Sequence, residues 1–172
     1  MEFESFCPGC GRNLDLPHYS DCPTFKRNDP RITREAMFFE ICEVIRKRSS
    51  CKRGQVGCVI VQDNRVVSMG YNGSPPGAPH CFELGCDVEE SNHEAGCQRA
   101  IHAEVNAVSF AARAGVRLEG GTLYCTHSPC LKCAQVLLSA GISGVHYLTP
   151  YRRTEGHDLL RDAGVPLQQW SE

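Results

Sequence analysis

The sequence lacks three features that would point to a membrane protein, an exported protein or a nucleic-acid-binding protein. No run approaches the roughly 18 consecutive apolar residues of a membrane-spanning helix. The first five residues, Met-Glu-Phe-Glu-Ser, are acidic and begin no apolar stretch of the kind that marks a secretory signal. The formal net charge is −2, so the strongly basic surface of a dedicated DNA- or RNA-binding protein is not expected. We therefore expect a cytoplasmic chain with no membrane partner and no stable nucleic-acid partner.

The remaining composition is ordinary except for cysteine. The 172 residues are 41% hydrophobic and 22% charged, which suits one globular domain with a buried core and is short of two. Twelve cysteines are dense for this length, and several lie in Cys-x-x-Cys spacing or near histidines. Disulfide scaffolds belong to small secreted chains, so we interpret the cysteines mainly as metal ligands.

Hydrophobic patterning predicts an α/β fold beyond residue 30. A first helix is expected over 33–48, with Thr33 as its N-cap, and its expected buried face is Met37, Ile41, Val44 and Ile45. The further predictions are a hairpin of strands 56–61 and 65–71, strands 122–126, 145–149 and 165–169, and helices 100–114, 130–140 and 158–163. Because strands and helices alternate after the hairpin, we expect a mixed sheet covered by helices.

Other residues receive structural assignments. Residues 72–96 form a predicted loop rich in glycine, proline and cysteine, and a loop of this length needs something to hold it. Three cysteines inside predicted elements are expected to be small buried hydrophobic residues: Cys42, Cys58 and Cys125. His146 and His157 have no ligand-like companions and are expected to be ordinary structural or surface residues.

Two motifs carry the chemistry. His102 and Glu104 lie in a His-Ala-Glu sequence at a predicted helix start, and Cys130 and Cys133 lie in a Pro-Cys-Leu-Lys-Cys sequence at another. Two thiolates and one imidazole leave the fourth position of a tetrahedral zinc for water, which is typical of a catalytic site. Glu104 can accept the proton of that water and pass it on. Taken alone, the Cys-x-x-Cys pair could also be a redox dithiol or half of a structural zinc site.

Together the motifs resemble the signature of zinc-dependent deaminases. From about Thr33 to its end, the chain resembles the cytidine/deoxycytidylate deaminase superfamily, and within it the deoxycytidylate (dCMP) deaminases. Gln55-Val56-Gly57 and Gly70-Tyr71-Asn72-Gly73-Ser74-Pro75 extend the resemblance. It implies a three-layer fold with a five-stranded mixed sheet flanked by helices. It also implies hydrolysis of dCMP to dUMP and ammonia, feeding thymidylate synthesis, by a hexamer that dCTP activates and dTTP inhibits.

The resemblance also suggests the residues that bind the nucleotide. Asn72 is expected to help hold the sugar and phosphate, and Tyr151 to line the nucleotide site. Ser128 lies where relatives contact the base. His127 beside it is either part of the pocket lining or a surface residue, and Arg152 and Arg153 either meet phosphate or are solvated.

A second, structural zinc is also implied by the resemblance. Its expected ligands are Cys51, Cys81, His93 and Cys97, with Cys86 as the alternative to Cys97. Four protein ligands would leave no position for water and would pin the long loop.

Residues 1–30 lie outside the resemblance and form a predicted extension to a deaminase domain over 31–172. Cys7 and Cys10 lie in a Cys-Pro-Gly-Cys-Gly turn that is typical of a zinc knuckle, and His18 and Cys22 are the nearest further ligands. The alternative is a flexible tail with reduced thiols.

Three other functions stay open. A 5-modified dCMP could be the substrate. A tRNA adenosine deaminase shares both motifs, but the net charge and the Gly-Tyr-Asn-Gly element disfavour it. A non-catalytic zinc-stabilised binding protein would have no need of Glu104.

Overall fold

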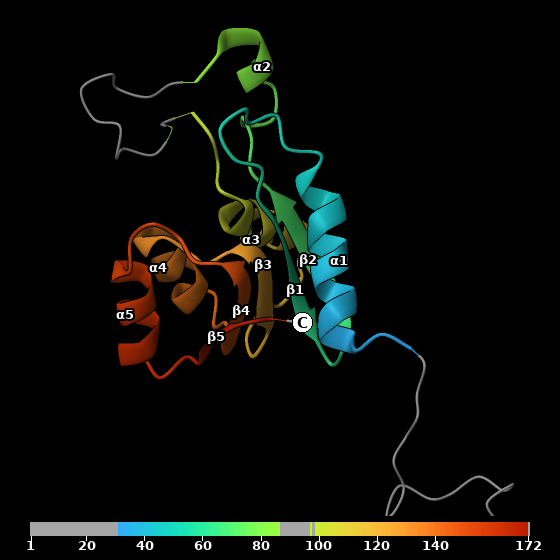
Figure 1. The fold of residues 1–172 in the computed structure, drawn as a ribbon, viewed down its shortest axis with the longest axis vertical. Coiled ribbons are helices and arrows are strands. Elements are labelled where there is room, and N and C mark those ends of the chain that lie inside the picture. Colours follow the sequence, from blue (N-terminus) through green and yellow to red (C-terminus); the bar gives the residue numbers. More distant parts are fainter. Residues whose placement is uncertain (1–30, 87–96, 98, 172) are drawn as a thin grey trace, which may run out of the picture. The chain divides into compact units, whose positions relative to one another are not determined.

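A mixed sheet of five strands organises the chain from Thr33 onward (Figure 1). The computed structural model describes residues 31–86, 97 and 99–171. The predicted ligands Cys7, Cys10, His18, Cys22 and His93 lie outside the described residues, as does the rest of the N-terminal extension. Within the described ranges, no helix has the length and apolar character that crossing a membrane requires.

The strands lie in the order β2-β1-β3-β4-β5. Their bounds are β1 Gly57–Gln62, β2 Arg65–Tyr71, β3 Thr122–His127, β4 Gly144–Thr149 and β5 Leu167–Gln169. β1 runs antiparallel to both β2 and β3, whereas β3, β4 and β5 run parallel. Asp63 and Asn64 connect β1 to β2 with φ angles of 47° and 61°, which suits a tight turn between twisted strands. The expected hairpin and mixed sheet are confirmed.

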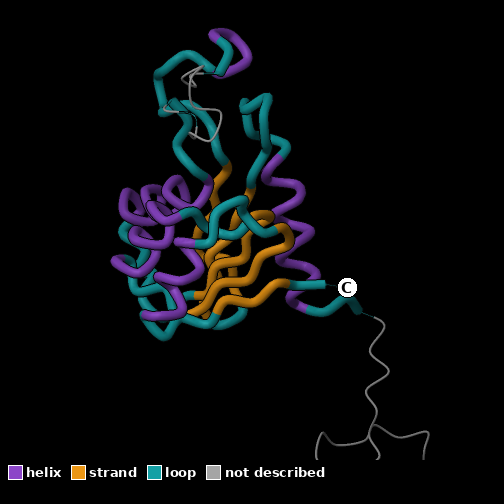
Figure 2. The backbone as a smooth tube through the Cα atoms, turned by 60° about the vertical axis from the view of Figure 1, so that its left-hand side comes forward, coloured by secondary structure: helices purple, strands orange, loops and turns teal. Residues whose placement is uncertain are grey.

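Helices cover both faces of the sheet (Figure 2). α1 (Arg34–Arg46) packs on one face, where Phe38, Phe39 and Cys42 meet Val59 and Tyr124. The other face carries α3 (Ala103–Ala114), α4 (Leu131–Ser139) and α5 (Glu155–Asp162). Because neighbouring side chains of a strand point to opposite faces, β1 contributes to both layers of the core. The three-layer architecture is therefore as expected.

The buried face of α1 agrees only in part with the predicted one, because Ile41 and Ile45 are partly buried and pack against the core as expected. Thr33 is the N-cap and accepts a hydrogen bond from the backbone N–H of Ala36, as expected. However, Met37 is 37% exposed and Val44 is 64% exposed. The helix instead turns Phe38 and Phe39 inward, where their rings pack against Tyr124 at centroid distances of 4.9 and 5.5 Å. Two aromatic rings bury more apolar area than Met37 and Val44 would, which explains the rotation of the helix.

Smaller differences lie at the element boundaries. α2 (Cys81–Leu84) is a single helical turn inside the predicted loop, and its first residue, Cys81, is buried. α3 begins at Ala103 rather than at residue 100, and α5 begins at Glu155 rather than at 158. The other expected burial is confirmed, because the side chains of Cys42, Cys58 and Cys125 are fully inaccessible. All nine described cysteines are free thiols.

Candidate metal centre and active-site pocket

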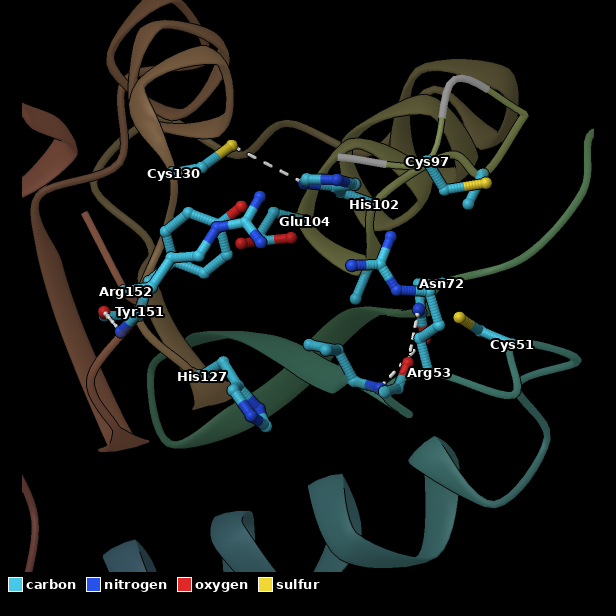
Figure 3. Close-up of a pocket in the computed structure, with 15 residues that line it drawn as sticks. Cys51, Arg53, Asn72, Cys97, His102, Glu104, His127, Cys130, Tyr151 and Arg152 are labelled. Atoms are coloured by element: carbon cyan, nitrogen blue, oxygen red, sulfur yellow. Dashed lines mark hydrogen bonds between the residues drawn. The ribbon is translucent and has the colours of Figure 1, made fainter. Parts of the chain in front are cut away.

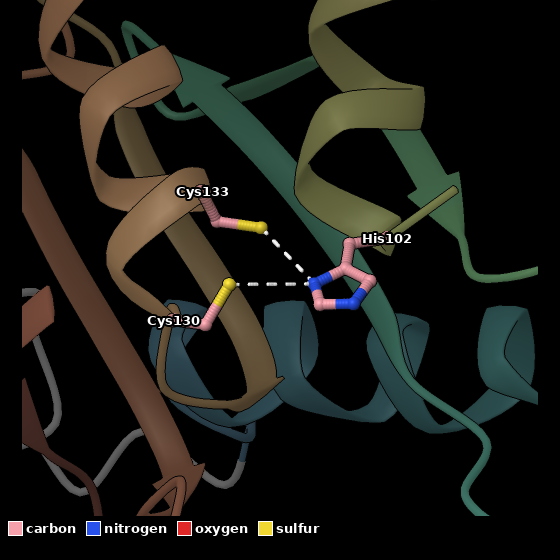
Figure 4. Close-up of side chains that lie close together, drawn as sticks. All are labelled: His102, Cys130 and Cys133. Atoms are coloured by element: carbon pink, nitrogen blue, oxygen red, sulfur yellow. Dashed lines mark hydrogen bonds between the residues drawn. The ribbon is translucent and has the colours of Figure 1, made fainter. Parts of the chain in front are cut away.

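Three side chains with metal-binding atoms converge between α3 and α4. The donor atoms of His102, Cys130 and Cys133 all lie within 4.8 Å of one another. His102 Nδ1 is 3.5 Å from Cys130 Sγ and 3.3 Å from Cys133 Sγ, and all three side chains point to a common centre (Figure 4). The structure therefore brings together the three residues that the two sequence motifs singled out.

The ends of two helices bring these residues together. His102 is the N-cap of α3 and Cys130 is the N-cap of α4, each with an extended backbone, and neither side chain makes a capping hydrogen bond. Both side chains are thus available to a metal ion. The positive ends of the two helix dipoles also favour a thiolate at this place.

A glycine lets α3 lie against the sheet at the required distance. A Cβ atom on Gly70 of β2 would overlap the carbonyl oxygen of Ala103 and lie 2.6 Å from the nitrogen of Ala107. Ser68, two residues earlier, donates a hydrogen bond of 2.7 Å to the carbonyl oxygen of Ala107. Only glycine permits this approach of strand to helix, so Gly70 helps to position the first turn of α3, which carries Glu104.

The charges in the cluster suit a divalent cation. Hydrogen bonding from Cys133 and His102 holds the pKa of Cys130 down to about 4, which favours the thiolate form of Cys130. The same bond to Cys130, together with burial, raises the pKa of Cys133, and hydrogen bonding to Cys130 raises the pKa of His102. The cluster thus holds protons that a metal ion would displace. Two sulfur donors and one imidazole nitrogen are a donor set that zinc accepts.

Glu104 lies beside this cluster with a side chain that is only 4% exposed. Burial raises its pKa, against the opposing effect of His102. A carboxyl group whose pKa moves toward neutrality can both accept and return a proton near neutral pH. Three donors next to such a group are the arrangement that is typical of a catalytic rather than a structural zinc site.

A cavity of about 250 Å³ opens next to the cluster (Figure 3). Its lining contains all four residues expected to bind substrate, namely Asn72, His127, Ser128 and Tyr151. His127 therefore belongs to the pocket rather than to the outer surface, and burial lowers its pKa.

Asn72 uses its side chain to hold the opposite wall of the cavity. Its Oδ1 accepts a hydrogen bond of 2.8 Å from the N–H of Val56, and its Nδ2 donates one of 2.8 Å to the carbonyl oxygen of Gly54. Asn72 thereby fixes the segment that follows Arg53. Its direct contact with a nucleotide stays a prediction.

Two arginines contribute positive charge to the lining. The guanidinium group of Arg152 lies 5.5 Å from the centre of the Tyr151 ring. Arg53, which directly precedes the segment that Asn72 holds, also lines the cavity (Figure 3). Sequence analysis did not select Arg53, because it belongs to no motif and only its position two residues before Gln55-Val56-Gly57 hints at the site. Arg153 does not line the cavity.

Of the ligands expected for a second zinc, Cys51, Cys81 and Cys97 lie within the described residues but do not form a close group of three. Cys51 and Cys97 line the same cavity, whereas Cys81 is buried at the start of α2 with its Sγ 3.8 Å from Ser74 Oγ. Among residues 31–86, 97 and 99–171, the only group of three close metal-binding side chains is the one at His102. The second zinc stays a prediction, because its expected ligand His93 lies outside these ranges. The alternative ligand Cys86 is exposed.

Comparisons with known proteins agree with this site. The family model of the cytidine and deoxycytidylate deaminase zinc-binding region matches residues 32–149. The chain is 36% identical over 140 residues to ComE operon protein 2 of Bacillus subtilis, covering 81% of this chain and 72% of that protein. It is 39% identical over 142 residues to the deoxycytidylate deaminase of Schizosaccharomyces pombe, covering 79% of this chain but only 44% of the fungal protein. The chain thus spans less than half of that relative.

A solved structure shows the same similarity. The dCMP deaminase of the cyanophage S-TIM5, in complex with dCMP and dUMP, superimposes with a TM-score of 0.70 at 30% identity. The match covers 81% of this chain and 100% of the phage chain. The chain described here belongs to the cytidine and deoxycytidylate deaminase family.

Proposed function

We propose that the chain hydrolyses dCMP to dUMP and ammonia with one zinc ion held by His102, Cys130 and Cys133. The observation that carries the proposal is the buried carboxyl group of Glu104, which lines the same cavity as His102 and Cys130 of the metal-binding cluster. The similarity to deoxycytidylate deaminases, one of them solved with dCMP and dUMP, supports the choice of substrate.

The residues of the chain divide the reaction between them. A zinc ion held by His102, Cys130 and Cys133 would supply Lewis-acid activation of the water that attacks C4 of the pyrimidine. Glu104 accepts a proton from that water and delivers it to N3, which makes C4 more electrophilic. Glu104 then transfers the proton that remains on the attacking oxygen to the departing amino group, which leaves as ammonia. Burial of Glu104 supports this double role, because the raised pKa of its carboxyl group makes the return of the proton easier.

The two arginines support a nucleotide rather than a nucleoside as the substrate. Arg53 and Arg152 both line the cavity, and guanidinium groups pair well with phosphate oxygens. In this proposal the base lies toward Glu104 and the 5′-phosphate toward the arginines, with His127, Ser128 and Tyr151 between them. Asn72 holds the wall near the sugar.

The test replaces Glu104 by glutamine and measures ammonia release and zinc content. Glu104→Gln keeps the size of the side chain and loses only the proton transfer, so zinc content and fold should be retained while turnover falls by about three or more orders of magnitude. Glu119→Gln is the matched control, because Glu119 is an exposed carboxylate that pairs with Arg117 and does not line the cavity. A Glu104→Gln variant that keeps a tenth of the activity would remove Glu104 from the mechanism.

The same assay defines the substrate. Ammonia release is compared for dCMP, deoxycytidine, dCTP and a 5-substituted dCMP. We expect dCMP to be the best substrate. Faster release from the 5-substituted nucleotide would reassign the substrate, and no release from any of them would overturn the proposed function.

We further propose the regulation and assembly that the family resemblance implies. These are activation by dCTP, inhibition by dTTP and a hexameric assembly, together with one structural zinc at Cys51, Cys81, His93 and Cys97. From the N-terminal Cys-Pro-Gly-Cys-Gly turn we propose a further structural zinc at Cys7, Cys10, His18 and Cys22. Saturation curves for dCMP that respond to neither dCTP nor dTTP would refute the regulation. The cytoplasmic location stays a prediction from composition.

A further inference from the structure

Ser128 and Tyr151 of the cavity are connected to a third residue, His157, which sequence analysis treated as ordinary. His157 lies in α5 with 9% of its surface exposed, and its Nε2 is 2.6 Å from Ser128 Oγ. The same oxygen accepts a hydrogen bond of 2.7 Å from the backbone N–H of Tyr151, which is drawn as a dashed line in Figure 3. His157 itself does not line the cavity.

The Ser128 hydroxyl group is the centre of this connection. Its side chain is 2% exposed, and it has one proton and two lone pairs to place. One lone pair receives the N–H of Tyr151. The contact with His157 uses either the hydroxyl proton or the other lone pair, depending on the tautomer of the ring. Without an imidazole there, a buried hydroxyl would lose one of its two partners.

Helix α5 holds His157 in a fixed place. A Cβ atom on the neighbouring Gly156 would lie 2.5 Å from the carbonyl oxygen of Pro129 and 2.8 Å from the carbonyl carbon of Cys130. The helix backbone therefore lies directly on the turn that carries Cys130. On its other side the His157 ring packs against Tyr147 of β4 at a centroid distance of 5.5 Å.

We propose that His157 is a positioning residue for the nucleotide pocket. It holds the Ser128 hydroxyl, Ser128 holds the backbone of Tyr151, and the segment with Tyr151 and Arg152 is thereby fixed along the cavity. Its effect on catalysis rests on the proposed function, because the kinetic measurement uses dCMP. The effect of His157 on the position of the Tyr151 segment is independent of the proposed function.

The test compares His157→Phe with His157→Gln. Phenylalanine keeps a ring against Tyr147 but loses the contact with Ser128, so KM for dCMP should rise about tenfold with kcat changed by less than about threefold. Glutamine can place its Nε2 near the same oxygen and should restore KM to within about threefold of the original. Zinc content should not change in either variant.

His146→Phe is the matched control. His146 is also a partly buried histidine stacked on a tyrosine, Tyr124, at a centroid distance of 4.8 Å, but it is outside the cavity lining. The same substitution there should leave KM and kcat unchanged. If His157→Phe gives too little folded protein, Ser128→Ala tests the same connection and should also raise KM for dCMP and speed the amide exchange around Tyr151.

A second readout needs no activity. Hydrogen–deuterium exchange of the backbone amides of residues 151–153 should be faster in His157→Phe and unchanged in His146→Phe. If no variant or original protein deaminates dCMP, but this exchange pattern is found, the proposed function fails and the positioning role stands. If His157→Phe lowers Tm and leaves both KM and this exchange unchanged, His157 is a structural residue only and the inference is wrong.

Discussion

Replacing Asn72 by alanine separates a structural role of this residue from a role in binding the nucleotide. The Asn72 side chain is 7% exposed and makes two hydrogen bonds of 2.8 Å, to the N–H of Val56 and to the carbonyl oxygen of Gly54. Alanine would leave both backbone groups without a partner. At about 1 to 2 kcal/mol for each group, the free energy of unfolding should fall by about 3 kcal/mol. For a domain of this size that corresponds to a decrease of roughly 6 to 12 °C in Tm.

Two further variants define the expected series. Asn106→Ala removes a single hydrogen bond of 3.0 Å, from Asn106 Nδ2 to the carbonyl oxygen of Tyr71, and should cost about 1 kcal/mol. Asn72→Asp keeps the acceptor for the Val56 N–H but loses the donor to Gly54, so it should be less stable than the original protein.

Urea unfolding followed by circular dichroism measures the free energies, and a dCMP saturation curve measures KM. If Asn72→Ala loses less than about 1 kcal/mol and raises KM strongly, the reasoning is refuted. Asn72 would then act mainly through the nucleotide.

Three further predictions concern the strand–helix contact, pH and the metal content. Gly70→Ala should destabilise the protein by about 3 kcal/mol or more and lower its activity, because the added Cβ atom would push α3 away from the sheet. In the control Gly144→Ala the added Cβ atom would lie 3.6 Å from Thr122, so this variant should be nearly neutral in thermal unfolding. Burial lowers the pKa of His127, His146 and His157 from 6.5 in the folded protein, so the unfolded chain binds more protons below that pH. The contribution of these three histidines to stability should therefore be fully present above pH 6.5 and be lost below it. Urea midpoints measured above and below pH 6.5 should decrease less in His146→Phe than in the original protein. An equal decrease in the two proteins would contradict the contribution of His146 to the pH dependence. Metal analysis should find about three zinc ions per chain in the full protein and about two after deletion of residues 1–30. If both proteins contain two zinc ions, residues 1–30 bind none, and the flexible-tail interpretation of Cys7, Cys10, His18 and Cys22 is the correct one.

The sequence predicted most elements because their signals are local. Thr33 marks the start of α1 through a hydrogen bond to a residue three positions away, and Gly115 ends α3 with a left-handed φ of 67°. The periodicity of β1 and β2 and the short turn between them likewise involve neighbouring residues. The short helix α2 was missed because a single turn of four residues has no room for a periodic pattern.

The kind of chemistry could also be predicted from the sequence because its signals are local. His102, Glu104, Cys130 and Cys133 lie in two short motifs whose spacing reflects metal coordination and proton transfer, so the kind of centre could be inferred before any geometry. The convergence of the three metal-binding side chains within 4.8 Å depended on the packing of α3 and α4.

Only the tertiary structure decided which contacts the motif residues make. Gly57 and Gly70 belong to recognisable motifs, but the reason for glycine is that the backbones of α1 and α3 press on them. Three features had no local signal: the inward position of Phe38 and Phe39 in α1, the place of Arg53 in the cavity, and the connection from His157 through Ser128 to Tyr151. Each depends on residues far apart in the sequence, and their meeting is set by the packing of helices on the sheet, which local periodicity and spacing do not encode.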